Sequence, residues 1–351
     1  MNFSELLKYT VENKASDLHI TTGIPPVMRK NGKLVRIGED KILPADTETF
    51  IHELLNEDQY EEYRKKGELD LSFSYAGIGR FRVNVFKQRG TSSLAIRQVN
   101  LIIPSLDELG LPEIVKEMAR KTKGLVLVTG PTGSGKSTTL AAMIDQINEE
   151  RDCHVLTLED PIEYLHKHKK SIINQREIGH DSLSYGAALR GALREDPDVI
   201  LVGEMRDIET IATAITAAET GHLVLSTLHT VGAANTIDRI IDVFPPYQQQ
   251  QIRIQLSMVL QGVISQQLLS RTDKPGRAAV VEIMTATSAI RNLIREAKTH
   301  QINSMIQTGL RFGMQTMDSS LAGLYRRGII SYEDALAYAT DQDNINRVLG
   351  N

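Results

Sequence analysis

Forty basic and 44 acidic residues leave this 351-residue chain with a net charge of −4, which argues against nucleic acid as its main partner. A hydrophobic share of 41% and a charged share of 24% are those of an ordinary soluble globular protein, and the length favours about two domains. The single cysteine, Cys153, excludes a disulfide framework and fits a reducing cytosol. We find no signal peptide and no apolar run near the roughly 18 residues of a membrane span, so membrane association is expected through partners.

The first hundred residues predict a small α+β domain with an antiparallel sheet. Apolar residues recur at helical spacing over 3–13, and an alternating strand follows over 16–21. Asn31-Gly32, between two short runs, is a hairpin signal. Two short helices are expected within 46–66, and alternating strands are expected at 69–75, 80–85 and 94–99.

Three arginines, Arg80, Arg82 and Arg97, fall on adjacent strands of this expected sheet. They have two interpretations. They are the solvated face of the sheet, or they serve a neighbouring subunit, because ring-forming nucleotide hydrolases often borrow an arginine for the γ-phosphate. The planar guanidinium matches phosphate oxygens, which suits the second role.

Pro104 and Pro112 bracket a connector, and we place an interdomain linker at 101–112. From residue 113 to 351, helices and apolar strands alternate, which predicts an α/β domain with a mainly parallel sheet followed by a small helical subdomain. Strands are expected at 124–129, 153–158, 198–203, 222–228 and 278–284. Helices are expected at 113–121, 137–149, 183–195, 207–219, 232–242 and 247–264, with further helices near 290–297, 317–326 and 331–340.

A phosphate-binding loop lies between the first of these strands and the helix after it. Strand, glycine-rich turn, Gly-Lys-Ser and helix form the P-loop pattern in the context it requires. Backbone amides and the helix N-terminus close around phosphate, Lys136 reaches the β- and γ-phosphates, and the Ser137 hydroxyl binds Mg²⁺. The predicted nucleotide-binding residues are Gly130, Pro131, Thr132, Gly133, Ser134, Gly135, Lys136, Ser137 and Thr138.

Carboxylates follow two of the other expected strands. Glu159 and Glu163 lie just after one strand, and either is a candidate base that orients or deprotonates water, the alternative being a cluster that caps a turn. The run 198–204 has the form of a Walker B strand, but Gly203 stands at the usual Asp position and Glu204 is the acidic residue that remains. We therefore expect Glu204 to support Mg²⁺, with water between them.

Histidines flank the next strand, with His222 at its start and His229 at its end. Each is either a structural hydrogen-bonding group or part of the site, and His229 is placed to sense the γ-phosphate or to link subunits. His166 and His168 lie among lysines in an expected basic loop and have no further ligands at zinc spacing. Arg291 and Arg295, four residues apart, form either a solvated helix face or a contact surface.

Taken together, these motifs resemble the secretion ATPase superfamily, and within it the type IV pilus retraction motors. The resemblance covers nearly the whole chain. An N-terminal signature corresponds to 15–20, the Walker A loop to 130–138 and an Asp box to 159–163. An atypical Walker B corresponds to 203–204, a His box to 221–229 and a motif associated with retraction to 289–296.

The resemblance implies a PAS-like N-terminal domain over 1–100, a RecA-like ATPase domain over 113–351 and a homohexamer that uses ATP and Mg²⁺. It assigns the general base to Glu163 and implies that Arg82 and Arg97 complete the nucleotide site, with Arg80 a weaker fit. It implies a cytoplasmic motor for pilus retraction and twitching motility, held at the inner membrane by a platform protein and the pilin machinery.

Three alternatives to the retraction motor stay open. One is a PilU-type accessory ATPase, which is also a candidate partner, and another is a RecA-like nucleic-acid translocase. The third is a ring that binds nucleotide and regulates a partner with negligible hydrolysis, against which the presence of both Glu163 and Glu204 argues. The single cysteine argues against the extension and secretion branches, which commonly carry a four-cysteine zinc module.

Overall fold

A computed structural model describes residues 2–30, 32–99, 102–342 and 345. Contacts divide the chain into two units, Met1–Leu101 with Glu163–Leu165, and Ile102–Ile162 with His166–Asn351. Asn31 of the expected hairpin and the first residue of the expected linker, 101, lie outside the described residues.

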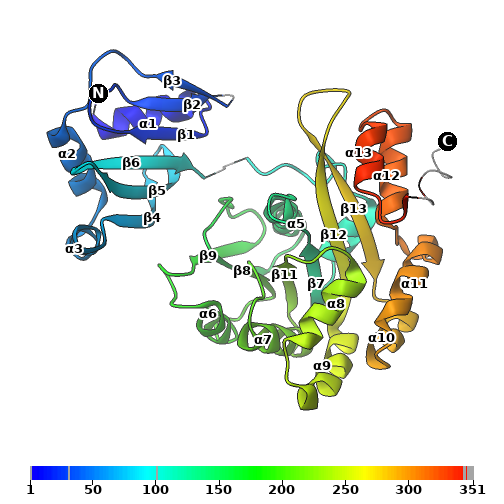
Figure 1. The fold of residues 1–351 in the computed structure, drawn as a ribbon. Helices are drawn as coiled ribbons and strands as arrows, with labels where there is room; N and C mark the ends of the chain where they lie inside the picture. Colours follow the sequence, from blue (N-terminus) through cyan, green and yellow to red (C-terminus); the bar gives the residue numbers. More distant parts are fainter. Residues whose placement is uncertain (1, 31, 100–101, 343–344, 346–351) are drawn as a thin grey trace. The chain divides into compact units, whose positions relative to one another are not determined.

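The first unit is built on a six-stranded antiparallel sheet in the order β3-β2-β1-β6-β5-β4, drawn in blue and cyan in Figure 1. On β5, Phe81, Val83 and Val85 are buried while Arg82 is exposed, as the alternation of the sequence predicts. The predicted α+β fold is confirmed. Its elements are α1 (Phe3–Glu12), β1 (Asp17–Ile20), β2 (Val27–Lys30), β3 (Lys33–Arg36), α2 (Pro44–Leu54), α3 (Glu57–Lys66), β4 (Glu68–Tyr75), β5 (Gly79–Gln88) and β6 (Thr91–Gln98).

The second unit contains a seven-stranded sheet in the order β13-β12-β7-β11-β10-β8-β9, in which only the β12–β13 pair is antiparallel. Its strands are β7 (Gly124–Thr129), β8 (His154–Glu159), β9 (Ile172–Glu177), β10 (Val199–Val202), β11 (Leu223–Leu228), β12 (Leu260–Ser270) and β13 (Arg277–Thr285). Its helices are α4 (Glu113–Ala119), α5 (Lys136–Glu150), α6 (Tyr185–Ala192), α7 (Ile208–Glu219), α8 (Ala233–Asp242), α9 (Pro246–Val259), α10 (Ser288–Arg295), η1 (Thr299–Gln301), α11 (Ile302–Thr308), η2 (Leu310–Phe312), α12 (Met317–Arg326) and α13 (Tyr332–Ala337).

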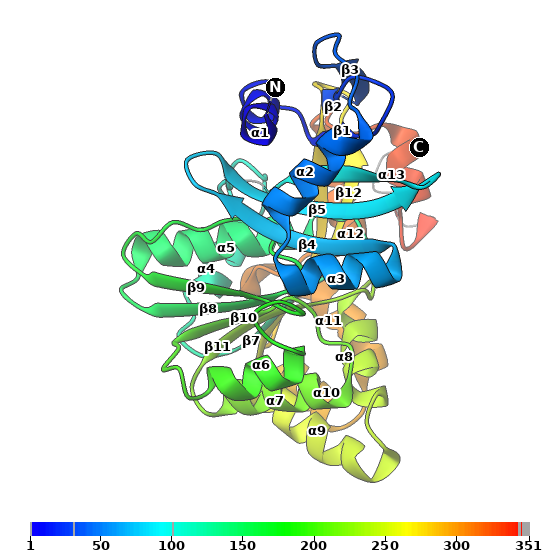
Figure 2. The same cartoon turned by 90° about the vertical axis from the view of Figure 1, so that its left-hand side faces the viewer.

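Helices cover both faces of this second sheet. Figure 2 shows α4 and α5 above the parallel strands and α6, α7 and α9 below them. Successive residues of β7 face opposite sides of the sheet, which explains the two layers. Val126 and Val128 belong to the core under α4 and α5, whereas Leu125 and Leu127 belong to the core under α6 to α10. A strand buried on both faces reads as a continuous apolar run, which is why the sequence predicted a parallel sheet.

Two predictions about this sheet are wrong. The helix expected to reach 264 ends at Val259, and β12 begins at Leu260 and pairs with the central strand β7. The apolar run after Val259 suits a helix and a buried strand equally, and pairing with β7 decides between them. Strand β9 was not expected at all, since its sequence is mostly polar and, as an edge strand, it buries only Ile173 and Glu177.

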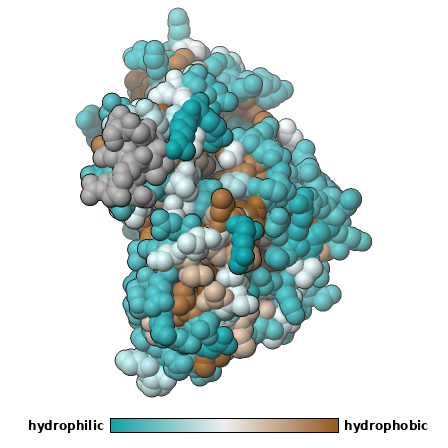
Figure 3. All heavy atoms as spheres, turned by 90° about the vertical axis from the view of Figure 1, so that its right-hand side faces the viewer, coloured by the Kyte–Doolittle hydropathy of each residue, from teal (hydrophilic) through white to brown (hydrophobic). Residues whose placement is uncertain are grey.

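The surface of the C-terminal helices is mixed. Figure 3 shows small groups of apolar side chains, in brown, between hydrophilic ones, in teal. Within the part of the chain that the structure describes, no helix is long and apolar enough to cross a membrane.

Candidate nucleotide-binding and hydrolysis site

The predicted P-loop connects the end of β7 to the start of α5, which begins at Lys136. Its first glycine is required by close packing. Gly130 has a φ of 138°, and a Cβ there would lie 2.1 Å from the backbone oxygen of Gln266 on β12. The loop is therefore held against the neighbouring strand at a distance that only glycine permits.

Lys136 is buried and turned onto its own loop. Its Nζ donates hydrogen bonds to the carbonyl oxygens of Gly130, at 2.9 Å, and Pro131, at 3.0 Å. Ser137 and Thr138 follow in the first turn of α5, half-buried beside the helix N-terminus. An ammonium, two hydroxyls and a helix N-terminus converge here, and this is the chemistry that holds a polyphosphate.

Gln266 is a residue of the site that sequence analysis missed. It is 2% exposed, its Oε1 accepts a hydrogen bond from Thr139 Oγ1 at 2.8 Å, and its Nε2 donates to the Ser134 carbonyl at 2.8 Å. The Gln266 side chain thus links the P-loop to the first turns of α5 through hydrogen bonds. A glutamine inside an apolar strand would have been a usable signal, but the strand itself was not predicted over 260–270.

A cavity of about 340 Å³ adjoins the P-loop beside Gly135 and Thr138. Gln266 forms part of its wall, and three arginines line it from the β12–β13 hairpin and the end of α12, namely Arg271, Arg277 and Arg327. Arg271 is already held by Asp273 through two hydrogen bonds of 2.9 and 2.6 Å. The cavity thus continues from the P-loop, and its wall carries Glu108 as well as the three arginines.

Carboxylates follow two adjacent parallel strands, as predicted. Leu158 of β8 pairs with Val202 of β10, so Glu159 and Glu204 leave the same edge of the sheet. Glu159 Oε1 accepts hydrogen bonds from Thr157 Oγ1 at 2.6 Å and from Gln175 Nε2 at 3.1 Å.

Glu204 lies beside the side chains of Arg206 and His229. Arg206 Nε is 2.8 Å and His229 Nε2 is 3.4 Å from Glu204 Oε2, and the Glu204 side chain is only 16% exposed. The three residues line a cavity of about 500 Å³ with Thr227 and Arg239. The structure thus brings Glu204 and His229 together at the carboxyl ends of β10 and β11.

The structure does not bring His222 to this place. His222 precedes β11, at the opposite edge of the sheet from the P-loop, and its carbonyl accepts a hydrogen bond from Gly124 at the start of β7. Its Nδ1 is 2.9 Å from the Ala217 carbonyl and 3.2 Å from Thr220 Oγ1, at the end of α7. These contacts fit the structural interpretation of His222.

The remaining predicted residues are Glu163, Arg82 and Arg97, and all three belong to the first unit. Glu163 is exposed. Arg82 and Arg97 are direct cross-strand partners on β5 and β6, and both are exposed beside a cavity of about 280 Å³. Arg97 Nε donates to Asp17 Oδ1 at 2.8 Å, whereas Arg80 Nη1 contacts Ser74 Oγ at 3.4 Å.

Asp17 is a second residue that the analysis of candidate sites missed, although it belongs to the N-terminal signature. Its side chain is 12% exposed. Burial alone would raise its pKa, but hydrogen bonds from Ser16 and Arg97 hold the pKa below the usual value for Asp. Asp17 is therefore charged at neutral pH and orients Arg97.

The oxygen donors of the second unit fit Mg²⁺. The Ser137 hydroxyl and the Glu204 carboxylate are hard ligands, and Mg²⁺ is usually held by few protein groups, several waters and substrate phosphates. Across the described residues, no three or more His, Cys, Asp or Glu side chains form a cluster that would hold a metal without substrate. His166 and His168 have other surroundings, since His166 Nδ1 is buried without a hydrogen bond and His168 Nδ1 accepts one from Ile173 N.

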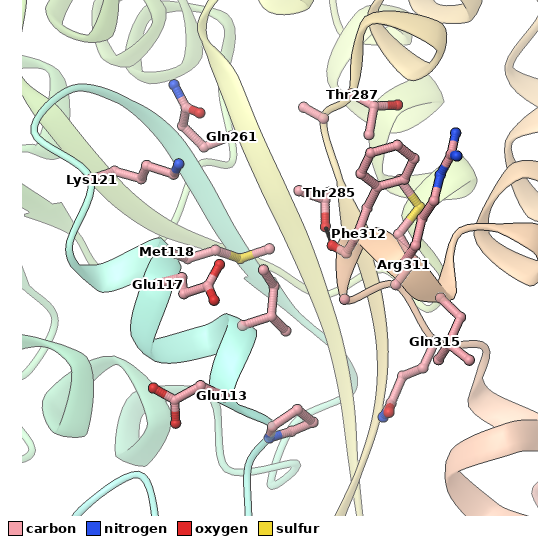
Figure 4. A pocket seen from close by; sticks show the side chains of 16 residues that line it. Glu113, Glu117, Met118, Lys121, Gln261, Thr285, Thr287, Arg311, Phe312 and Gln315 are labelled. Atoms are coloured by element: carbon pink, nitrogen blue, oxygen red, sulfur yellow. Dashed lines mark hydrogen bonds between the residues drawn. The ribbon is translucent and has the colours of Figure 1, made fainter.

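Another cavity, of about 680 Å³, lies away from the P-loop and is shown in Figure 4. Glu113 and Glu117 of α4 line one side, and Arg311 and Phe312 of η2 line the other. Thr285 Oγ1 donates to the Phe312 carbonyl at 2.8 Å. None of the predicted nucleotide-binding residues lines this cavity, so it is separate from the site.

A glycine loop between a parallel strand and a helix, a buried lysine, and carboxylates after neighbouring strands together define a P-loop nucleotide hydrolase. Residues 3–335 match the family model described as Type II/IV secretion system protein. The chain belongs to this family, and it is an ATPase that binds nucleotide.

Individual relatives match over the whole chain. The type IV pilus retraction ATPase PilT of Pseudomonas aeruginosa is 49% identical over 344 residues, covering 98% of this chain and 100% of the relative. The type IV pilus ATPase PilU of the same organism is 41% identical over 349 residues, covering 99% and 91%. A crystal structure of the pilus retraction motor PilT with bound ADP is 48% identical, has a TM-score of 0.91 and covers 99% of both chains. The predicted superfamily and fold class are confirmed.

Proposed function

We propose that this protein is the motor that retracts type IV pili, coupling ATP hydrolysis to the removal of pilin subunits. The observation that carries the proposal is the full-length match to PilT at 49% identity, against 41% for PilU. The similarity therefore favours the retraction motor over a PilU-type accessory ATPase.

The nucleotide binds to the second unit in this proposal. Lys136 exchanges the carbonyls of Gly130 and Pro131 for the β- and γ-phosphates, whose negative charge makes them stronger acceptors. The backbone amides of 130–138 and the N-terminus of α5 hold the same phosphates. The cavity beside Gly135 and Thr138 takes the base and ribose.

Hydrolysis depends on positioning and electrostatics, as in other P-loop enzymes. Ser137 and Glu204 would hold and support Mg²⁺, which would supply positive charge to the phosphates. Glu163 is proposed to activate the attacking water, and His229 to hold Glu204 and sense the γ-phosphate. Arg82 and Arg97 of a neighbouring subunit would stabilise the charge on the γ-phosphoryl group as it passes from ADP to water.

These arginines require a neighbouring subunit, and the family resemblance supports a homohexamer. We place the domains at 1–100 and 113–351, and rotation about the linker 101–112 turns closure of the site into mechanical displacement. The ring is proposed to act in the cytoplasm, at an inner-membrane platform protein and the pilin machinery, with a PilU-type ATPase as a candidate partner. No role for nucleic acid is proposed.

Phosphate release by the purified protein tests the proposal. We expect steady-state ATP turnover that falls at least tenfold in Glu204→Gln and in Lys136→Ala, with Glu117→Gln as a control outside the site. Turnover within twofold of the parent in both variants would contradict the assigned roles. Adding DNA tests the translocase alternative, which predicts a large, salt-sensitive stimulation.

The cellular role is tested in a strain that has lost its retraction motor. Expression of this protein is expected to restore twitching motility, whereas the Lys136→Ala variant is expected to leave the cells non-motile. Restoration only when a PilU-type ATPase is removed, or in no strain, would contradict the retraction assignment.

A further inference from the structure

In the atypical Walker B strand, Gly203 stands where an aspartate is usual, and the side chain of Tyr185 lies in the space beside it. At Gly203, directly after β10, a Cβ would lie 2.7 Å from Tyr185 Oη and 3.1 Å from the Leu158 carbonyl. A side chain at residue 203 would therefore require the Tyr185 hydroxyl to move. The phenol hydroxyl occupies the space from which an aspartate carboxylate would extend.

Tyr185 is placed here by the start of a helix and by packing of its ring. It is the first residue of α6, whose N-cap Ser184 accepts a hydrogen bond from Ala187 N at 3.2 Å. Its ring packs against the core of the second unit. The start of α6 and the core contacts of the ring thus place the hydroxyl beside Gly203.

The hydroxyl group has unused hydrogen-bonding capacity. Within the described ranges, no residue forms a hydrogen bond with Tyr185 Oη. Burial chiefly, and then the charges of Glu204, Asp160 and Glu159, raise the pKa of Tyr185, so the phenol keeps its proton at neutral pH. A neutral hydroxyl has one proton to donate and lone pairs to accept.

We propose that Tyr185 is a positioning residue that replaces the missing Walker B aspartate. Resting on the proposed ATP hydrolysis, its hydroxyl would hold a water beside Glu204 when Mg²⁺ and nucleotide are bound. The Walker B carboxylate of other P-loop enzymes supports Mg²⁺ as an acceptor. A phenol hydroxyl that hydrogen-bonds to a water beside Glu204 would perform that task without adding a fourth carboxylate to an edge that already carries Glu159, Asp160 and Glu204.

The Tyr185→Phe variant removes only the hydroxyl. We expect kcat for ATP to fall about 10- to 100-fold, the range found when outer-shell partners of metal sites are removed, with KM for ATP within about twofold. We also expect a fluorescent ADP analogue to need at least threefold more Mg²⁺ for half-maximal binding, a readout without hydrolysis. Tyr247→Phe is the matched control, since Tyr247 is 82% exposed and its hydroxyl contacts only Gln248.

A rescue experiment separates positioning from packing. In Tyr185→Ala the space beside residue 203 opens, leaving the Leu158 carbonyl as the near neighbour. Adding Gly203→Asp to this variant is expected to raise kcat at least tenfold, whereas Gly203→Asp alone clashes with Tyr185 and lowers it. Rates are normalised to the fraction of sites that bind the ADP analogue, so that a poorly folded variant is still scored.

The inference is overturned if Tyr185→Phe keeps kcat within twofold and its Mg²⁺ requirement unchanged, or if the double variant is no faster than Tyr185→Ala. Glu204→Gln distinguishes this failure from a failure of the proposed function. If Glu204→Gln loses turnover and Tyr185→Phe keeps it, only the proposed role of Tyr185 is contradicted. Normal turnover in Glu204→Gln removes the hydrolysis scheme itself.

Discussion

Asp17 and Arg97 lie directly opposite each other on β1 and β6, and the guanidinium donates a 2.8 Å hydrogen bond to the carboxylate. The next residue along this row is Arg82, directly opposite Arg97 on β5. Two like charges in a direct cross-strand pair destabilise a sheet. Asp17 compensates one of these charges and fixes the direction of a side chain that is otherwise 70% exposed.

We predict that Asp17→Asn lowers ATP turnover about tenfold. This loss is much smaller than the 10³- to 10⁵-fold contribution that an arginine makes by stabilising the γ-phosphate. Nucleotide affinity is expected to stay within twofold, because the P-loop is unchanged. Steady-state phosphate release and binding of a fluorescent ADP analogue measure the two quantities. Asp70→Asn, which alters an exposed carboxylate of the same cavity, is the control and is expected to keep parental turnover.

Gln266 is predicted to determine nucleotide affinity through the shape of the P-loop. Gln266→Leu removes the hydrogen bonds to Thr139 and to the Ser134 carbonyl and leaves both groups buried without a partner. We expect ADP to bind about tenfold more weakly, by calorimetry. A double-mutant cycle with Thr139→Val is expected to give a coupling energy of about 1 kcal/mol.

Gln261→Leu is the matched control, because Gln261 lies on the same strand and donates to the Lys123 carbonyl at the far end of β7. Equal losses of ADP affinity in the Gln266 and Gln261 variants would mean that any damage to β12 weakens binding.

The stability of the second unit is predicted to depend on pH through His166. Burial lowers the pKa of His166 to about 4, Asp145 opposes this shift and Lys169 adds to it. The unfolded chain takes up this proton near pH 6.5 and the folded chain only near pH 4, so acidification favours unfolding. The contribution is fully present above pH 6.5 and is lost as the pH falls, by about 3 kcal/mol at most.

His166→Leu is expected to remove this slope and to leave stability at pH 7.5 within about 1 kcal/mol of the parent. Urea denaturation of both proteins between pH 4.5 and 7.5, followed by tyrosine fluorescence, provides the comparison. If the free energy of unfolding depended on pH in the same way in both proteins, groups other than His166 would be responsible for the pH dependence.

Arg291 and Arg295 are predicted to differ, although the sequence presents them as a pair. Arg291 Nη1 donates to the carbonyls of Ser257 and Met258, at 2.6 and 2.7 Å, and so caps the C-terminal end of α9. Arg291→Ala is expected to lower the free energy of unfolding by about 1–2 kcal/mol, since the side chain is only half-buried. Arg295→Ala, at an exposed position, is expected to change it by less than about 0.5 kcal/mol.

Thermal and urea unfolding of both variants measures the difference. If Arg295→Ala abolishes pilus retraction while keeping parental stability and ATP turnover, Arg295 belongs to a contact surface. A loss of stability in Arg295→Ala as large as that in Arg291→Ala would contradict the distinction.

Local sequence patterns were sufficient for much of the fold. The P-loop, the Walker B run and the alternation of β5 are decided by neighbouring residues, because glycine conformations, buried apolar runs and a period of two act within a few positions. These patterns predicted the α+β and α/β architecture, the strand ends that carry Glu159, Glu204 and His229, and the nucleotide-binding loop.

Tertiary structure decided what depends on residues far apart in the chain. The run after Val259 became a strand only through pairing with β7, and this pairing placed Gln266 against the P-loop from more than 125 positions away. In the same way, Tyr185 fills the space at Gly203, and Asp17 orients Arg97 across 80 positions. No local pattern contains these contacts, because the free energy that selects them comes from packing and hydrogen bonds formed only when the sheets assemble.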